Sequence, residues 1–493
     1  MTSFFKIAGF TVAQALVSTL IALTVGLAAA FLTGRRTFFW RRFLLSLSPV
    51  PFCLPSLLVA LGYVTFFGMN GILNRLLSSL TGNNEPALTF LYSFAGIVIC
   101  HGFYNFPLVM STVSSAWERL PDGEESAARL LGAGSFKVFR TITFFKLLPS
   151  IVSACIPVFL YCFFSFMIVL LFGTVGTTTL EVEIFEQAKV NLNFPLALKM
   201  GVAETAIALI FVSLYTALER KSRGVRGISF EGELKEKPAL CGSEKVFAFF
   251  VLALIFLFFI CPFFSILYNA LSSRRLASNF TPYNFAQLSR SSRFLNAVLW
   301  TFITAGLCGF LCAFLAFLYA VVLKSADRSG RFAVLRVIPV LPMAVSSVIV
   351  GIVLTLLVKK GNFLVLVLAQ VFISWPVAFR QIYAAMQKIP QGTVDVAVIL
   401  SRSPADVVFK LYLPVCRGAF LQAAGFCFAL SAGDATLPLV LALPRFDTLA
   451  LYTYRLAGRY KFNEACAAGV ILGLLCVLVF VLAKAAGKKS TSK

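Results

Sequence analysis

The sequence is poor in the side chains that most enzymes use. Among 493 residues it contains one histidine, His101, and only 13% of its residues are charged. A lone histidine makes a set of nucleophile, histidine and carboxylate implausible. The sequence also lacks a phosphate-binding loop of the Walker A type, because the nearest stretch, residues 487–490, has no leading Gly and reads as a basic tail. We therefore expect no enzyme activity from this chain, and any ATP hydrolysis belongs to a partner protein.

The twelve cysteines indicate neither a disulfide framework nor a metal centre. Most of them fall inside long apolar runs, and none lies clearly in an external loop. Cys308 and Cys312 are one helical turn apart, but in an apolar run this spacing favours packing of small residues over metal binding. No metal ion and no cofactor is predicted.

Long apolar runs dominate the chain. Hydrophobic residues make up 59% of the sequence, and its mean hydropathy is +0.90. Runs of about 20 residues or more are long enough to cross a bilayer as helices. We count eleven, at about residues 7–33, 43–68, 88–112, 147–173, 195–218, 246–270, 294–323, 333–358, 362–386, 415–442 and 464–485. The strands of a membrane barrel would be shorter and would alternate in polarity, so the sequence predicts an all-α polytopic membrane protein with about 11 transmembrane helices.

The distribution of positive charge predicts the orientation of the chain. Its formal net charge of +23 would by itself also be compatible with nucleic-acid binding. If eleven spans alternate from an external N-terminus, the internal loops hold 29 of the 43 Lys and Arg residues and the external loops hold 14. This bias follows the positive-inside rule. We therefore expect a multi-pass protein of the lipid bilayer, with its N-terminus outside, its C-terminus in the cytoplasm and no nucleic-acid partner.

The sequence contains an internal repeat. Residues 106–107 and 120–123 read Phe-Pro and Leu-Pro-Asp-Gly, whereas residues 375–376 and 389–392 read Trp-Pro and Ile-Pro-Gln-Gly. All paired positions are separated by the same number of residues, that from 106 to 375, and residues 120–123 and 389–392 lie in predicted internal loops. The two halves therefore share one orientation, about an axis along the membrane normal that places a substrate path between them. The predicted division is a first transmembrane domain at 1–220 with about 5 helices, a cytoplasmic linker at 221–245, and a second transmembrane domain at 246–493 with about 6 helices.

Each copy of the repeat contains a short helix outside the spans. In the first copy Glu125 favours the start of a helix, because an acidic side chain complements the helix dipole, and Gly132 ends it. In the second copy Ser403 is a candidate N-cap for the helix that follows. A loose loop does not need the apolar face that Leu130 and Leu131 give the first helix, so this face must be buried on something.

These repeats resemble the EAA loop of permeases from bacterial binding-protein-dependent ABC importers, of the thiamine and iron(III) type with MetI-like transmembrane domains. The loop is written Glu-Ala-Ala, three residues, Gly, and a Leu-Pro about thirteen residues later. The positions that carry the resemblance are Glu125, Ser126, Ala127, Ala128 and Gly132 in the first copy, and Asp395, Ala397, Ser401 and Pro414 in the second. The first copy departs from the pattern, because Ser126 stands at the Glu position and Phe144-Phe145 replace the Leu-Pro.

The resemblance covers nearly the whole chain and implies a fused, two-half permease in the bacterial cytoplasmic (inner) membrane. In that family the short helices dock in a cleft of a cytoplasmic ATPase subunit, here expected in two copies. A periplasmic or lipid-anchored binding protein delivers the substrate. The resemblance favours thiamine or its phosphates, with ferric iron as the first alternative and polyamines, phosphonates and sulfate after it.

Three polar residues in the predicted spans are candidates for the translocation path: Asp434, His101 and Asn105. A charge inside a span is costly and needs a polar surrounding. Asp434 follows Gly433, so it either caps a break in the helix or lines the path. His101 either makes an interhelical hydrogen bond or lines the path, and the sequence leaves both pairs of alternatives open.

An ion-coupled secondary transporter is the competing class of function. Such a protein needs ionisable groups inside the membrane for coupling, and it does not need docking helices on the inside. This chain has few such groups and has two such helices, so the sequence favours the ABC importer.

Overall fold

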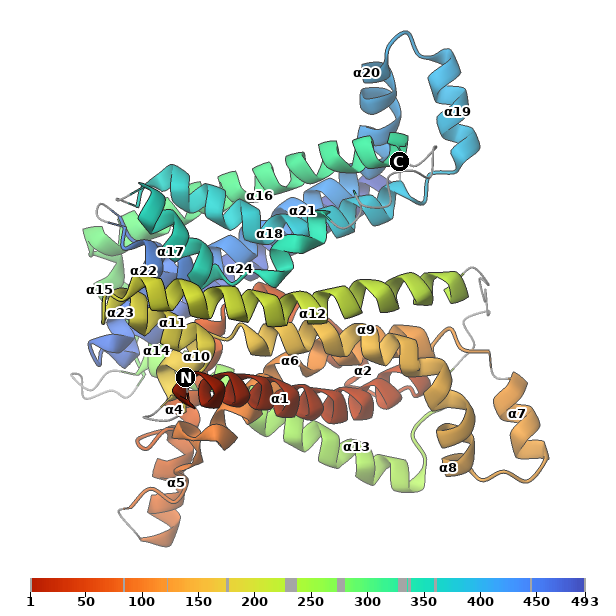
Figure 1. The fold of residues 1–493 in the computed structure, drawn as a ribbon. Coiled ribbons are helices and arrows are strands. Elements are labelled where there is room, and N and C mark those ends of the chain that lie inside the picture. The colour runs from red at the N-terminus through yellow and green to blue at the C-terminus, as the bar shows by residue number, and fades with distance from the viewer. Residues whose placement is uncertain are drawn as a thin grey trace. The chain divides into compact units, whose positions relative to one another are not determined.

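The computed structural model describes residues 2–82, 85–121, 123–173, 177–226, 237–272, 280–326, 335, 338–358, 361–443 and 446–491. These residues form helices joined by loops, with no strand among them and one isolated bridge, between Thr37 and Ala239 (Figure 1). Ten of the described helices are long and apolar enough to cross a membrane, or eleven if the bent pair Ile338–Ala344 and Ser347–Val358 is one span. The prediction of an all-α membrane protein with about 11 spans is confirmed.

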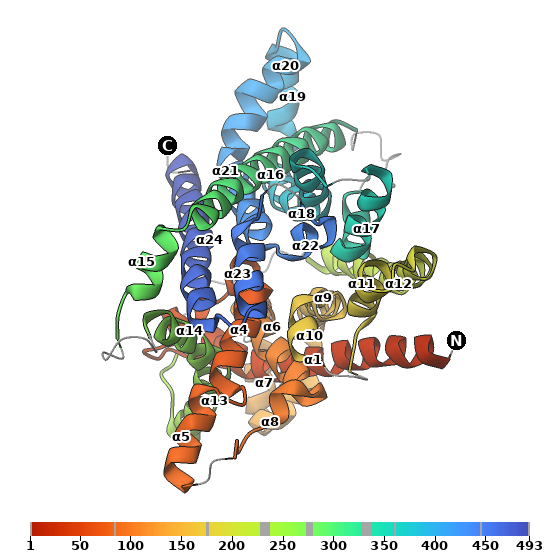
Figure 2. The ribbon, with the colours of Figure 1, turned by 90° about the vertical axis from the view of Figure 1, so that its left-hand side faces the viewer.

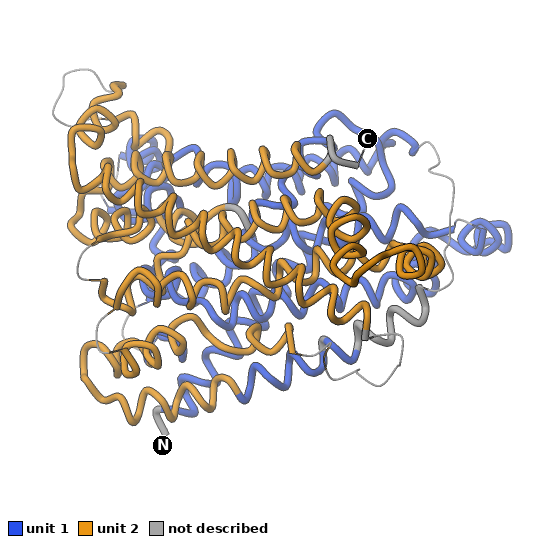
Figure 3. Tube along the Cα trace, turned by 90° about the horizontal axis from the view of Figure 1, so that it is seen from above, with its two compact units in different colours: residues 1–51, 62–183, 206–265 blue, residues 52–61, 184–205, 266–493 orange. Residues whose placement is uncertain are grey.

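The chain divides into two compact units (Figure 3). Unit 1 comprises residues 1–51, 62–183 and 206–265, and unit 2 comprises residues 52–61, 184–205 and 266–493. The units are defined by packing, whereas the division into domains was drawn from the repeat. That division stays a prediction, and residues 227–236 of its linker lie outside the described residues.

Three helices form the centre of unit 1: α1 (Thr2–Arg35), α6 (Phe94–Trp117) and α9 (Phe144–Phe163). An added Cβ at Gly26 of α1 would lie 2.6 Å from the Cβ of Val109 on α6. Glycine thus lets the two backbones approach closely, as is common between membrane helices. The other helices before residue 272 are α2 (Arg41–Ser46), α3 (Val50–Cys53), α4 (Ser56–Phe67), α5 (Ile72–Thr81), α7 (Gly123–Leu130), α8 (Ser135–Val138), α10 (Met167–Phe172), α11 (Leu180–Lys189), α12 (Phe194–Arg226), α13 (Gly242–Ile255) and α14 (Cys261–Leu271).

Four long helices form the centre of unit 2: α16 (Ser292–Ala326), α18 (Phe363–Met386), α21 (Leu413–Gly433) and α24 (Phe462–Thr491). Cys308 and Cys312 lie fully buried in its apolar core, as the packing interpretation predicted. The remaining helices are α15 (Tyr283–Ser289), α17 (Ser347–Val358), α19 (Gln391–Leu400), α20 (Pro404–Val407), α22 (Thr436–Leu441) and α23 (Leu449–Gly458). Figure 2 shows α19 and α20 standing out from the other helices of this unit.

The sequence repeat is also a structural repeat. Helix α8 and the π-helical turn Phe139–Thr143 recur, at the same offset in the sequence, as α20 and the π-helical turn Val408–Tyr412. A π-helical turn holds one extra residue and is frequent at functional sites. The backbone N–H of Leu180 donates to Thr11 Oγ1 at 2.9 Å in unit 1, and that of Leu449 donates to Thr301 Oγ1 at 2.7 Å in unit 2. The two halves therefore repeat single hydrogen bonds as well as helices.

Several predicted spans are not single helices. The apolar run at 43–68 is divided among α2, α3 and α4, and α4 begins directly after Pro55. The continuous span predicted there is wrong, because proline lacks a backbone N–H and disfavours the helical conformation of the residue before it. The runs at 147–173 and 415–442 each break near their ends, into α9 and α10 and into α21 and α22.

The close contact between α1 and α6 predicts that Gly26→Ala destabilises unit 1. The added methyl group would overlap Val109, and overpacking of this kind costs about 1–3 kcal/mol. Gly9→Ala on the same helix is the matched control, because no atom lies within 4 Å of its added Cβ. Thermal unfolding in detergent should give a lower melting temperature for Gly26→Ala and an unchanged or higher one for Gly9→Ala. Equal melting temperatures for the two variants would contradict the packing described.

Candidate coupling loops and buried polar groups

The first loop begins where α6 ends and contains α7, which projects from one end of unit 1 (Figure 1). Gly132 stops α7 in the left-handed conformation, with φ at +84°. The N–H of Gly132 donates to the carbonyl of Arg129 at 2.9 Å, and the N–H of Ala133 donates to that of Ala128 at 3.0 Å. This pair of bonds is a Schellman motif, which residues with a side chain form at a cost. Gly132 therefore ends the helix as the sequence predicted.

Both loops expose large apolar side chains at equivalent positions. Leu130 and Leu131 at the end of α7 are each 89% exposed. Ile399 and Leu400, the equivalent residues at the end of α19, are 80% and 79% exposed. Exposed apolar side chains that gather at one place mark an interaction surface. The two pairs give this chain the same apolar feature twice, once in each unit.

The carboxylate of Glu125 points away from that surface. It forms an ion pair with Arg35 at the end of α1 and accepts a hydrogen bond of 2.7 Å from Thr143 Oγ1 in the π-helical turn. Glu125 is 6% exposed, whereas Ser126 and Ala127 beside it are exposed and Ala128 is half-buried. Glu125 therefore holds α7 to unit 1, and the neighbouring small residues remain accessible.

The second loop ends its helix in a different way. Ser401 takes the place of Gly132, and its backbone is extended, with φ at −83°. No left-handed residue is needed there, which explains why a serine is accepted. The following helix starts as predicted, because Ser403 Oγ accepts a hydrogen bond from the N–H of Asp406 at 3.3 Å.

The other predicted positions of the second loop lie close to these. Asp395 and Ala397 are half-buried on α19, and Pro414 is exposed in the first turn of α21. Proline removes one backbone hydrogen bond from a helix, and Pro414 stands two residues after the π-helical turn Val408–Tyr412, where the regular hydrogen-bond pattern is already interrupted.

His101 and Asn105 lie in a buried hydrogen-bonded cluster of unit 1. The Nε2 atom of His101 lies 2.6 Å from Ser165 Oγ, in the break that follows α9. The amide of Asn105 donates to the carbonyl of His101 at 3.0 Å, and that of Gln14 on α1 donates to the carbonyl of Cys162 at 2.6 Å. The cluster joins α1, α6 and α9, so His101 makes the interhelical contact that was one of its two alternatives.

Asp434 lies at the equivalent break in unit 2. Its Oδ1 atom accepts hydrogen bonds from the N–H groups of Thr436 at 2.9 Å and Leu437 at 3.3 Å, so it caps α22. Beside it, Gln370 Oε1 accepts a hydrogen bond of 2.6 Å from Ser431 Oγ. The capping alternative is therefore present in the structure. A carboxylate has about four acceptor sites, so capping does not exclude a second role.

Sequence reasoning located Ser165 only as the first-half counterpart of Asp434, and it missed Gln370 and Ser431, although the repeat could have found Gln370. Ser165 and Asp434 are separated by the offset of the repeat, and so are His101 and Gln370. Each half thus places polar side chains at the same two positions. His101 and Gln370 occupy the first position, in α6 and α18, and Ser165 and Asp434 occupy the second, at the helix break. Each of these residues alone is ordinary in a membrane helix. The signal that could have identified them is the spacing that the two halves share.

A polar pocket of about 490 Å³ lies at the end of unit 2 opposite to α19. Its cationic residues are Arg293, Arg455, Arg459 and Lys461. Arg455 pairs with Asp447 at 2.6 Å and Lys461 pairs with Glu464 at 3.2 Å, while Arg293 and Arg459 are exposed. Helix α16 shows that the pocket and α19 lie at opposite ends of unit 2. Near one end of α16, Trp300 stacks on Phe446 of the pocket, and near the other end Lys324 donates a hydrogen bond to the carbonyl of Ile389 beside α19.

Comparison with known proteins shows that the chain is similar to permease proteins of transport systems. Residues 22–224 and 328–490 match the family described as "Binding-protein-dependent transport system inner membrane component". The chain is 26% identical to the thiamine transport system permease protein ThiP of Brucella abortus, over 98% of this chain and 88% of the relative. It is 25% identical to ThiP of Escherichia coli, over 96% and 87%. A shorter match, 29% identical over 35% of this chain and 60% of the relative, is to a putative 2-aminoethylphosphonate transport system permease protein of Salmonella typhi.

Proposed function

Because this chain belongs to the family of binding-protein-dependent transport system inner membrane components, we propose that it is the fused permease of a thiamine importer powered by a separate ATPase. The family matches the chain in two parts, in keeping with a permease whose two halves are joined in one polypeptide. The observation that carries the proposal is the pair of exposed apolar helix ends, Leu130 and Leu131 in one loop and Ile399 and Leu400 in the other.

The two loops are the proposed docking sites for two ATPase subunits. Each loop presents a short helix whose apolar end is exposed, and a protein cleft would remove these side chains from water. Burial of a leucine or isoleucine side chain contributes about 1.5–3 kcal/mol. Two such side chains in each loop would contribute about 3–6 kcal/mol to a contact with the ATPase, and closure of the ATPase pair would then move both loops together.

The ends of the helices support the proposed orientation. In unit 1, α1 starts at Thr2 and reaches the first loop only at its other end, where Arg35 meets Glu125. In unit 2, Gly487 near the end of α24 touches Gly418 at the start of α21, directly after the second loop. If the loops face the cytoplasm, the N-terminus is therefore external and the C-terminus is cytoplasmic. We propose this orientation in the bacterial inner membrane.

Docking of the ATPase predicts the effect of an arginine in each loop. Ala128 and Ala397 are half-buried small residues on α7 and α19, and an arginine at either position would hold a partner's cleft open. We expect Ala128→Arg combined with Ala397→Arg to reduce recovery of the ATPase with the permease at least about tenfold, which corresponds to ~1.4 kcal/mol. Ala286→Arg is the control, because Ala286 is exposed on α15 at the opposite end of unit 2. Undiminished recovery and undiminished transport-coupled ATPase activity would refute the docking role.

We propose that the external binding protein docks on the polar pocket of unit 2 and that it does so through acidic groups on its own surface. The segments 271–293, 358–363 and 441–464 contain ten Lys and Arg residues against two acidic residues. The corresponding segments of the first repeat, 1–6, 68–94 and 173–199, contain four of each. An excess of positive charge outside runs against the positive-inside rule, so it needs a functional reason. A negatively charged partner that must arrive and leave quickly supplies one, because complementary charge speeds association.

Charge reversal tests this docking surface. Arg293→Glu combined with Arg459→Glu should weaken stimulation of the ATPase by the binding protein at least about tenfold in half-saturating concentration, ~1.4 kcal/mol, and should reduce its dependence on salt. Recovery of the ATPase with the permease should not change. Arg75→Glu on α5 is the matched control, since Arg75 is exposed at an external end of the first repeat. Equal losses in the control and the double variant would show that overall charge, and not this pocket, is responsible.

Thiamine is the proposed substrate on two grounds. The relatives that match nearly the whole chain are named as thiamine permeases, and Asp434 offers one carboxylate beside the uncharged polar side chains of Gln370 and Ser431. Thiamine carries a positive charge, and a carboxylate on its route would stabilise that charge inside the membrane. Ferric iron and phosphonate remain the alternatives, of which the second agrees with the name of the shorter match.

Asp434→Asn separates the two roles of this residue. Asparagine keeps the oxygen that caps α22, so the variant should assemble normally and keep its ATPase activity. If the charge serves a cationic substrate, uptake of radiolabelled thiamine should fall about tenfold or more, since a lost charge interaction of ~1.4 kcal/mol has that effect. Asp434→Leu removes the cap as well and should lower the melting temperature. Full uptake by the asparagine variant would rule out the charge role.

A further inference from the structure

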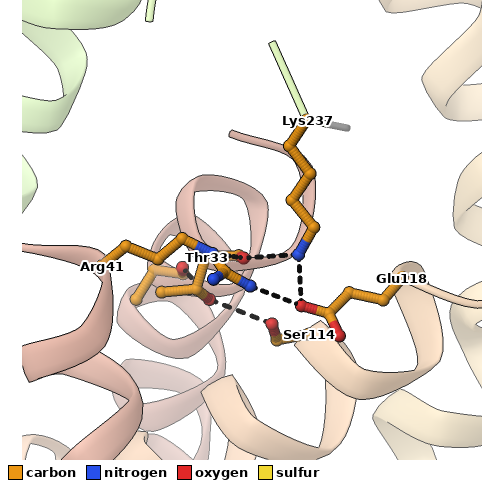
Figure 4. Close-up of polar contacts among 6 residues, drawn as sticks. Thr33, Arg41, Ser114, Glu118 and Lys237 are labelled. Atoms are coloured by element: carbon orange, nitrogen blue, oxygen red, sulfur yellow. Dashed lines mark hydrogen bonds and ion pairs between the residues drawn. The ribbon is translucent and has the colours of Figure 1, made fainter. Parts of the chain in front are cut away.

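A cluster of charges lies at the base of the first coupling loop, outside the residues that resemble the family motif (Figure 4). Glu118 directly follows α6, and its Oε1 atom receives hydrogen bonds from two cations, Arg41 on α2 and Lys237. The distance to Arg41 is 2.8 Å. Lys237 comes from the far side of the sequence, 119 residues from Glu118, in the stretch that precedes α13.

The position of Glu118 explains why it needs two cations. The carbonyl end of a helix carries a partial negative charge, so a carboxylate at the end of α6 is destabilising unless cations offset it. The same two cations also satisfy the end of α1. The carbonyl of Thr33 accepts hydrogen bonds from Arg41 Nε at 2.8 Å and from Lys237 Nζ at 3.4 Å. Thr33 Oγ1 in turn donates to Ser114 Oγ on α6 at 3.1 Å. The ends of α1 and α6 are thus joined through Lys237 and Arg41.

The stretch that carries Lys237 is held along its length. The N–H of Thr37 donates to the carbonyl of Pro238 at 3.0 Å. Glu244, in the first turn of α13, accepts two hydrogen bonds from the guanidinium of Arg36, and these bonds raise the pKa of Arg36. Residues 237–244 therefore lie fixed against the turn between α1 and α2, and we call them the staple.

The staple and the first coupling helix are held by one short segment. Arg35 binds Glu125 of α7, and the adjoining residues Arg36 and Thr37 bind the staple. Glu118 lies five residues before the first residue of α7, at Gly123. The second repeat differs, because the residue equivalent to Glu118 is Gln387, which is uncharged and exposed.

We propose that the staple positions the first coupling loop, with Lys237 and Glu118 as its central pair. The chain that joins the two repeats thereby fixes the direction in which α7 leaves unit 1. Because the loop cannot bend, a displacement of α7 by the ATPase also displaces α1 and α6. In the second coupling loop, the uncharged Gln387 cannot form the ion pair that Glu118 forms in the first. The effect on transport rests on the proposed function, whereas the effect on the loop itself does not.

Hydrogen–deuterium exchange on the full chain in lipid nanodiscs tests the effect on the loop. Lys237→Met should speed amide exchange in residues 123–130 about fivefold or more, the result of losing one partly buried charge pair. Residues 391–400 of the second loop should exchange as before. Lys237→Arg restores the cation and should behave like the unmodified chain. Lys245→Met is the matched control, because Lys245 is exposed one residue after the staple.

A double-mutant cycle separates positioning from general destabilisation. Glu118→Gln should speed exchange at least as much as Lys237→Met, because it also removes the ion pair with Arg41. Adding Lys237→Met to Glu118→Gln should have little further effect, since the pair of Lys237 and Glu118 is already lost. In the complex with the ATPase, both variants should be recovered with as much ATPase as the unmodified chain. The amount of substrate transported per ATP hydrolysed should fall. Unchanged exchange in residues 123–130, or additive effects of the two changes, would overturn the staple. Faster exchange with unchanged transport per ATP would overturn its role in coupling. Failure of the unmodified chain to bind any ATPase would instead overturn the proposed function, and the exchange result would still decide the staple.

Discussion

A peptide group inside a bilayer finds no water to bond with, and this constraint accounts for most of the structure. Helices satisfy it along their length, so the chain forms long helices wherever it is apolar. The constraint becomes visible where a helix breaks. At the break after α21, Asp434 accepts hydrogen bonds from two N–H groups of α22. At the equivalent break after α9, the carbonyl of Ser165 accepts a hydrogen bond from Thr179 Oγ1 at 3.3 Å. Both breaks therefore carry their own polar partners.

The loops that contain α7 and α19 are built alike but are held in different ways. Each has a short helix, a stop and a π-helical turn that leads into a long helix. The first uses Gly132 in the left-handed conformation and ties α7 down through Glu125, whereas the second uses an extended Ser401. The residues of the first loop, which the sequence motif treats as one functional unit, thus have separate structural roles. Glu125 anchors the helix, Gly132 ends it, and the exposed leucines before it are available to a partner.

The sequence predicted the parts of the fold that depend on local pattern. The apolar runs predicted the spans, because bilayer thickness sets a length that any run must meet, and the common offset between the two copies of the repeat located both loops. The sequence could not predict that Glu125 turns inward or that Lys237 reaches Glu118. Those contacts join residues far apart in the chain, and their geometry depends on how α1, α2 and α6 pack. It also missed the division of the run at 43–68, because hydropathy alone does not register the prolines within it.

The central claim is that the ends of α7 and α19 are contact surfaces for an ATPase. Photo-crosslinking within the assembled transporter tests it most directly, with a photoreactive amino acid in place of Leu131, Leu400 or Leu80. All three side chains are exposed, and Leu80 lies on α5, at the end of unit 1 opposite to α7 (Figure 1). We expect the probes at 131 and 400 each to capture the ATPase subunit and the probe at 80 to capture none. Absence of an ATPase adduct at both loop positions, or equal capture at position 80, would contradict the account.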